Sequence, residues 1–118
     1  MAGYRIDRVS EDIKREIISV IRELKDPRVM DKMITVVRVE VSSDASFAKV
    51  FVSAMEGIET AQLAVKGLTS ATGFIRREVG KRLHLRKTPE LKFVADDSIE
   101  KGMGIAKMLG NISSESND

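Results

Sequence analysis

The sequence predicts an α+β domain in which helices cover one face of a three-stranded sheet. Two segments in the first half alternate apolar and polar residues, which is the period of a half-buried strand. Before and after them, apolar residues recur at three- and four-residue steps, the period of an amphipathic helix. The 118 residues, 42% hydrophobic and without cysteine, suffice for one core without disulfides. Each helix must bury one apolar stripe, so we expect the helices to pack on the sheet.

The first predicted helix has an apolar stripe that runs from Ile6 to Leu24 at three- and four-residue steps. Acidic residues near its start would interact favourably with the positive end of the helix dipole. These residues are Asp7, Glu11 and Asp12. We expect Pro27 to end the helix, because the residue before a proline is disfavoured in the helical region.

Two strands are predicted next, over residues 34–42 and 48–54. Arg38 and Glu40 alternate with valines in the first of them, and the second shows the same alternation. The valines expected to face the core are Val37, Val39, Val41, Val50 and Val52. Residues 42–46 read Ser-Ser-Asp-Ala-Ser and have turn chemistry. The two strands should therefore form an antiparallel hairpin.

A pair of helices is predicted over residues 61–83, with no room for a loop between them. The apolar positions are Ala61, Ala64, Val65 and Leu68 in the first helix and Ile75, Val79 and Leu83 in the second. Thr60 is the expected N-cap, and the phase of the repeat breaks at Gly73. Because glycine adopts backbone angles that other residues resist, Gly73 either bends the pair sharply or caps the first helix before the second begins.

The last predicted strand covers residues 91–95, directly after Pro89. Asp97, with Glu100 three residues later, is typical of a helix start. The apolar positions of this final helix would be Ile99, Met103, Ala106 and Leu109, and Gly102 and Gly104 would weaken it. We expect residues 1–110 to form a single domain and residues 111–118 to be a disordered polar tail.

The charges are polarised along the chain, although the net charge is only +2. Residues 66–92 hold eight Lys or Arg against two Glu, a net of +6, whereas residues 93–118 have a net of −3. A basic segment in a nearly neutral chain is typical of nucleic-acid binding, because each neutralised phosphate releases condensed counterions. A basic helix face that serves solubility alone would leave the same pattern.

The residue inventory does not favour catalysis. There is one histidine and no cysteine, and no Ser/His/Asp spacing indicates a triad. Asp96 and Asp97 could hold a divalent ion, but helix capping explains them more simply. Gly102-x-Gly104 resembles a dinucleotide-binding loop, yet Lys107 stands where the third glycine belongs. We therefore expect no enzyme activity, no metal and no cofactor.

No stretch of the chain indicates a membrane partner. The first residues lack the apolar core of a signal peptide, and no run approaches the roughly 18 apolar residues that a span needs. We expect a cytoplasmic protein.

The order of elements, with two helices joined at a short glycine-containing step, resembles a type II KH domain. In KH domains a Gly-x-x-Gly loop at this junction clamps nucleic-acid backbone. Here Ala71-Thr72-Gly73 takes its place, and an Ala-x-Gly bend is similar to that of the ribosome-binding factor A family. Further segments similar to this family are Arg8-Val9 and residues 24–28, 39–44, 48–53, 89–93 and 96–98. The resemblance runs from about Arg5 to Leu109.

The resemblance implies a bacterial assembly factor that binds the free 30S small ribosomal subunit. It implies contact with 16S rRNA near its 5′ terminal helix, promotion of late subunit maturation and of precursor rRNA processing, and a role in growth in the cold. Release by a ribosome-associated GTPase is a further implied partnership, and we expect a monomer. The alternative is a KH-like protein-interaction module, or a general RNA-binding protein not dedicated to the ribosome.

Nine residues are predicted to form the RNA-binding site. They are Ala71, Thr72, Gly73, Arg76, Arg77, Lys81, Arg82, Arg86 and Lys87. The six cations would contact phosphates, and the small residues of the bend would allow close approach. On a helical wheel Arg77 and Lys81 lie opposite the apolar stripe, whereas Arg76 and Arg82 flank the core with their aliphatic stems.

Three other residues have two possible roles. His84 either stacks on a base or fills a helix end. Arg28 and Arg38 either extend the basic surface or lie on solvated faces. The four phenylalanines are expected in the core, and Phe51, on the outward side of its strand, is the one we would expect to be exposed if any is.

Overall fold

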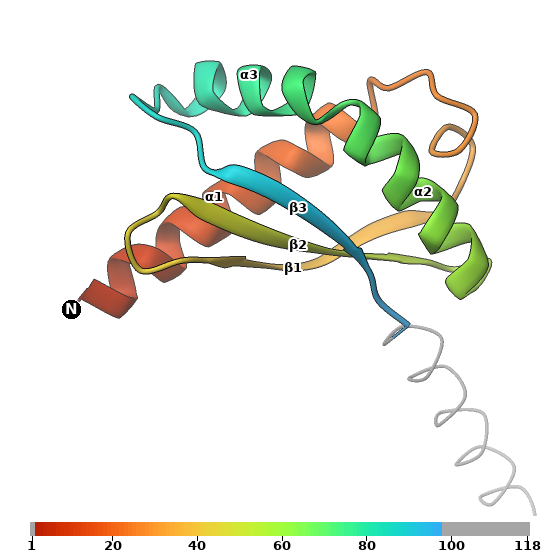
Figure 1. The fold of residues 1–118 in the computed structure, drawn as a ribbon, viewed down its shortest axis with the longest axis horizontal. Coiled ribbons are helices and arrows are strands. Elements are labelled where there is room, and N and C mark those ends of the chain that lie inside the picture. Colours follow the sequence, from red (N-terminus) through yellow and green to blue (C-terminus); the bar gives the residue numbers. More distant parts are fainter. Residues whose placement is uncertain (1, 98–118) are drawn as a thin grey trace, which may run out of the picture.

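The computed structural model describes residues 2–97, and side chains from residue 8 onward. Its elements are α1 (Ala2–Ile21), β1 (Ile34–Val41), β2 (Phe47–Ala54), α2 (Ile58–Ser70), α3 (Thr72–Leu83) and β3 (Glu90–Ala95). The sheet order is β1-β2-β3, with β1 and β2 antiparallel and β2 and β3 parallel (Figure 1). The predicted α+β class and the three strands are confirmed. The expected helix over residues 97–109 and the tail over residues 111–118 lie outside the described residues.

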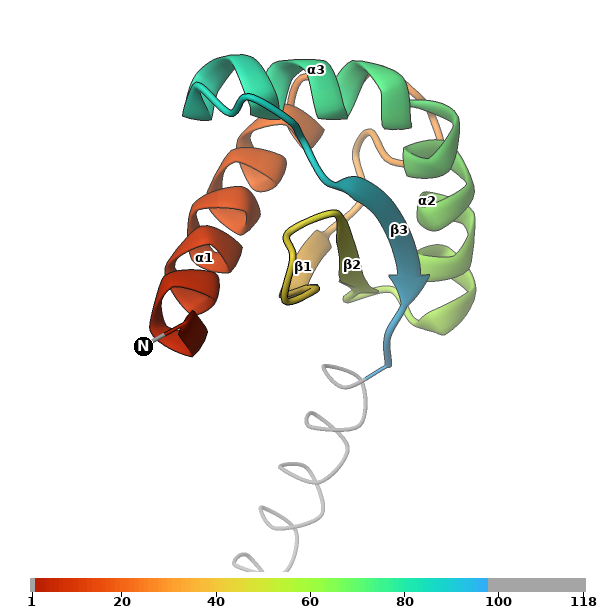
Figure 2. The same ribbon diagram turned by 60° about the vertical axis from the view of Figure 1, so that its left-hand side comes forward.

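The core lies between one face of the sheet and the three helices, which surround that face (Figure 2). Its members from the helices and the loop after α1 are Ile13, Ile17, Val20, Ile21, Val29, Ala64, Leu68, Ile75 and Val79. Those from the sheet are Val36, Val39, Ala48, Val50, Val52 and Phe93. Alternate residues of β2 enter this core, as the period of a strand requires. The opposite face of the sheet has no helix of the described residues packed on it.

The hairpin has one irregularity that the alternation did not predict. The register between β1 and β2 shifts between Val36 and Arg38, so β1 carries an extra residue there. Such a bulge leaves one residue without a partner on the neighbouring strand. Val36 is 3% exposed, whereas Val37 is only half-buried. The prediction that Val37 faces the core was therefore wrong at this position, and Val36 takes its place.

The first helix begins and ends earlier than predicted. It starts at Ala2, and its first turn has no acidic residue. It ends at Ile21, after which the amide of Leu24 donates to the carbonyl of Ile21 at 3.1 Å. This turn still leaves Leu24 against the core, which is why the apolar spacing continues past the end of the helix. Pro27 lies in the loop that follows and does not end the helix itself.

The second helix begins without the expected cap. Thr60 is its third residue, and the N-cap position is held by Gly57 with φ 118° and ψ 177°. The carbonyl of Gly57 accepts the first helical bond, from the amide of Ala61 at 3.1 Å. A positive φ of this kind is open to glycine and costly for other residues. The prediction of Thr60 as N-cap was wrong because Gly57 reverses the chain directly into Ile58.

Candidate nucleic-acid interface

The bend between α2 and α3 is formed by one residue, Ala71 (Figures 1 and 2). Ala71 has φ −94° and ψ 8°, and its amide donates to the carbonyls of Gly67 and Leu68, both at 3.1 Å. Its own carbonyl accepts from the amide of Ile75 at 2.9 Å, which begins α3. The hydroxyl of Thr72 donates to the carbonyl of Thr69 at 2.7 Å, so it satisfies an end group of α2. The sharp bend is thus present, with its pivot at Ala71.

Gly73 does not supply the backbone conformation of the bend. It is the second residue of α3, and within residues 2–97 only Gly57 among the glycines has a positive φ. It is also not the cap of α2, a position held by Ala71. A Cβ built on Gly73 would meet nothing within 4 Å. Neither predicted role of Gly73 therefore holds, and nothing inside the described part of the protein requires glycine here.

The two faces of α3 differ sharply in burial. Ile75 and Val79 are fully buried against the core, and the exposed side chains on the opposite face include Arg77 and Lys81. Arg86 and Lys87, in the loop after the helix, are exposed as well. None of these four cations makes an ion pair within the described residues. We call them the open cations of the α3 face, because their charges are not neutralised by a neighbouring carboxylate.

Arg76 fastens α3 to the loop that leads into β3. Its Nε donates to the carbonyl of Pro89 at 3.0 Å and its Nη2 to the carbonyl of Thr88 at 2.8 Å. Gly80 lies so close to the Thr88 hydroxyl that a Cβ there would clash with it. The guanidinium of Arg76 is therefore used within the fold, and its contacts fix the end of the loop that carries Arg86 and Lys87.

Arg82 fastens α3 to α1. Its Nη2 lies 2.8 Å from Glu23 Oε1 and 3.4 Å from Glu78 Oε1, and its Nη1 donates to Ser19 Oγ at 3.1 Å. Glu16 Oε2 is 4.0 Å from Nη1. The hydrogen bond that Arg82 donates to Glu23 raises the pKa of Arg82 above its ordinary value. Arg82 thus holds three carboxylates together, and its charge is compensated inside the protein.

The C-terminal end of α3 is closed by His84. This residue is in the left-handed region, with φ 54° and ψ 40°, and the amide of Leu85 donates to the carbonyl of Gly80 at 2.9 Å. This is the hydrogen-bonding pattern of a common helix C-cap. The backbone of His84 ends the helix, while its side chain is exposed.

Arg28 and Arg38 have partners within the fold. Arg28 donates four hydrogen bonds to the carboxylate of Asp26, one from its backbone amide and three from its guanidinium, the shortest at 2.6 Å from Nη2. These bonds lower the pKa of Asp26 to about 2. Arg38 pairs with Glu40 at 3.1 Å and lies 4.1 Å from the centre of the Phe51 ring. Neither arginine adds an open cation to the α3 face.

Phe74 is the residue of this surface that the prediction missed. It is 39% exposed, although the phenylalanines were expected in the core. It precedes Arg77 by three positions and Lys81 by seven, so the three share one side of α3. That spacing was visible in the sequence. Phe51, the phenylalanine expected to be exposed if any was, is only 8% exposed, because Arg38 and Lys49 lie over its ring.

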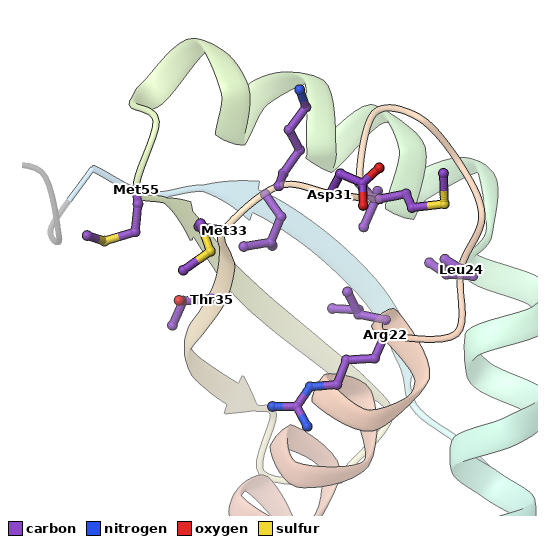
Figure 3. Close-up of a pocket in the computed structure, with 11 residues that line it drawn as sticks. Arg22, Leu24, Asp31, Met33, Thr35 and Met55 are labelled. Atoms are coloured by element: carbon purple, nitrogen blue, oxygen red, sulfur yellow. The ribbon is translucent and has the colours of Figure 1, made fainter.

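A pocket lies away from α3. It has a volume of about 380 Å³ and opens between the end of α1 and the start of β1 (Figure 3). Its lining includes Arg22, Leu24, Asp31, Met33, Thr35 and Met55, and no residue of α3. Within residues 2–97 no group of three His, Asp or Glu is placed to hold a metal ion. None of the described helices combines the length and the hydropathy of a membrane span.

This architecture, with a two-helix bend that crosses from β2 to the parallel strand β3, defines a KH-like α+β protein with an exposed basic helix face. The family model of ribosome-binding factor A matches residues 5–109. The chain therefore belongs to the ribosome-binding factor A family, as its resemblance indicated. This family is named for binding and not for a catalysed reaction, which agrees with the expectation that the chain is not an enzyme.

Relatives and solved structures agree with this membership. The ribosome-binding factor A of Acetivibrio thermocellus is 49% identical over 112 residues, covering 94% of this chain and 90% of the relative. That of Clostridium novyi is 46% identical over 113 residues, covering 95% and 93%. The crystal structure of ribosome-binding factor A from Thermus thermophilus has a TM-score of 0.67 at 28% identity, covering 76% of this chain and 93% of that one. A homology model of the Thermus protein, fitted into a cryo-EM map of its complex with the 30S subunit, has a TM-score of 0.63 at 28% identity, covering 75% and 92%.

Proposed function

We propose that this chain binds the free 30S ribosomal subunit and that the open cations of the α3 face contact phosphates of 16S rRNA. The observation that carries the proposal is the state of these cations. Arg77, Lys81, Arg86 and Lys87 are exposed and lack ion pairs within the described residues. Cations without internal partners can release phosphate counterions when they bind, which is the main source of affinity for RNA backbone.

Arg76 and Arg82 have a different part in this proposal. Their guanidinium groups are bonded to backbone carbonyls and to glutamates, respectively. They hold α3 against β3 and against α1, so that the open cations keep a fixed arrangement. Little side-chain bulk projects from the outer side of the bend formed by Ala71, Thr72 and Gly73. Gly73 has no side chain, and the Thr72 hydroxyl is bonded to a carbonyl of α2. A backbone phosphate can therefore approach the start of α3 closely.

The small subunit as partner is supported by the Thermus relative that was fitted as a complex with the 30S subunit. The family resemblance supplies the finer parts of the proposal. These are contact near the 5′ terminal helix of 16S rRNA, promotion of late maturation and precursor rRNA processing, a role in cold adaptation, and release by a ribosome-associated GTPase. We further propose a cytoplasmic protein that acts as a monomer.

The test is co-sedimentation with purified 30S subunits. The wild-type protein should travel with free 30S subunits and be absent from translating ribosomes. The double variant Arg77→Glu/Lys81→Glu should stay at the top of the gradient, because two phosphate attractions become repulsions. Both side chains are exposed, so circular dichroism should show an unchanged fold.

A matched control is available at the pocket between the end of α1 and the start of β1, which no residue of α3 lines. Arg22 and Lys32 match Arg77 and Lys81 in charge and exposure, and like them they make no ion pair within the described residues. The variant Arg22→Glu/Lys32→Glu changes the net charge equally and should still co-sediment. Equal loss in both variants would show that only total charge matters. Full binding by the α3 variant would show that this face is not the interface and would favour a protein-interaction module.

A further inference from the structure

Phe74 has an unusual setting for an apolar side chain of α3. Its neighbour Ile75 is fully buried, while Phe74 is 39% exposed at the first turn of the helix. A single exposed apolar residue is normal on a protein surface, so exposure alone means little. Here, however, the space next to Phe74 is open, because a Cβ built on the neighbouring Gly73 would meet nothing within 4 Å.

The open cations continue along the same side of the helix. At a rise of about 1.5 Å per residue, Arg77 and Lys81 lie about 4.5 Å and 10.5 Å beyond Phe74 along the axis. An aromatic ring beside a row of unpaired cations is the combination with which proteins bind single-stranded nucleic acid, because the ring stacks on a base while the cations follow the backbone. Phe47, which is 38% exposed at the start of β2, differs in that its partner on the neighbouring strand is the acidic Glu90, although Lys49 and Lys92 follow it along the sheet.

We propose that Phe74 stacks on an unpaired base of the RNA whose phosphates bind to the α3 face. The proposal rests on the proposed function and adds the class of RNA to it. A base that stacks on a side chain must be free of its own neighbours, so the target is a single-stranded segment and not a continuous duplex. All four bases have a π face, so the contact selects unpaired RNA with little preference for sequence.

The chain contains no tryptophan, which allows a direct test. The variant Phe74→Trp places a single indole at the proposed platform and keeps an aromatic ring there. A single-stranded RNA of about ten nucleotides, a length that covers one typical binding site, should quench the emission of this indole. The same strand annealed to its complement should quench it much less. Phe47→Trp is the matched control, because Phe47 is equally exposed, and its emission should not respond to either RNA.

Affinity measurements separate stacking from charge. Phe74→Ala and Phe74→Leu should each weaken binding of the single strand by roughly 5- to 150-fold, the range for loss of one stacked base. Neither should change the slope of affinity against salt concentration, because the number of phosphate contacts is unaltered. Binding of the duplex should be the same for both variants and the wild type.

Three outcomes would overturn the proposal while leaving the proposed function intact. One is wild-type affinity of Phe74→Ala for the single strand. Another is full affinity of Phe74→Leu, which would show that apolar bulk and not a ring is needed. The third is a loss of 30S binding by Phe74→Ala without any loss for the naked single strand, which would indicate a ribosomal protein as the contact. If the proposed function itself were wrong, Arg77→Glu/Lys81→Glu would bind 30S subunits like the wild type.

Discussion

Alanine substitution at two glycines of α3 should have opposite effects on stability. Gly73 and Gly80 lie on the same helix, and neither has a positive φ. Glycine in a helix costs about 0.5–1 kcal/mol relative to alanine, because the unfolded chain loses more freedom. A Cβ at Gly73 meets nothing within 4 Å, so Gly73→Ala should gain most of that amount. For a chain of this size, the gain raises Tm by about 2–4 °C.

At Gly80 the new methyl group would clash with the hydroxyl of Thr88. Thr88 cannot withdraw easily, because its χ1 is restricted and its carbonyl accepts a bond from Arg76. Overpacking of this kind costs about 1–3 kcal/mol, which offsets the gain in helix propensity. Gly80→Ala should therefore leave the free energy of unfolding unchanged or lower it by up to about 2 kcal/mol. In a Thr88→Ala background the same change should become stabilising.

Thermal and urea unfolding followed by circular dichroism measure both effects. Combined with 30S co-sedimentation, they show what the glycine at position 73 is for. If the outer side of the bend must admit a phosphate, Gly73→Ala should raise Tm and weaken binding at the same time. A fall in Tm for Gly73→Ala would refute the conclusion that Ala71 alone forms the bend. A rise for Gly80→Ala equal to that for Gly73→Ala would refute the close approach of α3 to Thr88.

Three further results are expected. Replacing Arg77 and Lys81 with glutamine should reduce the slope of log affinity for RNA against log salt concentration by about 0.7–0.9 for each lost phosphate contact. Fluorescence titrations at several salt concentrations would measure this slope. An unchanged slope would mean that these side chains contact no phosphate. Hydrogen bonds from Arg28 to Asp26 and from Ser46 to Asp44 lower both aspartate pKa values to about 2, so the stability that these carboxylates contribute is complete above about pH 4 and is lost as the pH falls towards 2. In urea unfolding between pH 5 and 2, the free energy of unfolding should fall less steeply with pH for Asp26→Asn and Asp44→Asn than for the wild type. An equally steep fall in the variants and the wild type would contradict this. Leu68 is fully buried, so Leu68→Ala should lower the free energy of unfolding by about 2–5 kcal/mol, and a loss under about 1 kcal/mol in urea unfolding would place Leu68 outside the packed core.

The fold could be predicted because burial follows short periods. Alternation marks β1 and β2, a short apolar segment after Pro89 marks β3, and three- and four-residue steps mark the helices. The predictions were wrong where the backbone conformation changes, at the bulge of β1 and the end of α1, while the spacing of apolar residues stays the same. Both Val36 and Val37 suit a strand, so nothing in the sequence marks the bulge between Val36 and Arg38. Leu24 keeps its place against the core after α1 has ended, so its spacing still looks helical.

The candidate interface was only partly predictable, for a different reason. Local spacing shows that Arg77 and Lys81 lie opposite the buried stripe. Whether a cation is open, however, depends on partners that are distant in sequence. Arg82 bonds to Glu23, 59 residues away, and Arg76 to carbonyls that only the path of the following loop brings near. RNA contact by the nine predicted residues stays a prediction.

The three glutamates around Arg82 also influence how a ribonucleoprotein surface can meet this protein. Glu16, Glu23 and Glu78 lie around Arg82, and Glu16 is also paired with Arg15 at 3.6 Å, so three negative charges face two positive ones. If the open cations bind RNA as proposed, the polyanion is attracted to them and repelled by the excess negative charge around Arg82. A dipolar surface of this kind produces a torque during diffusional approach. The molecule should consequently rotate into one docking orientation before any short-range contact forms.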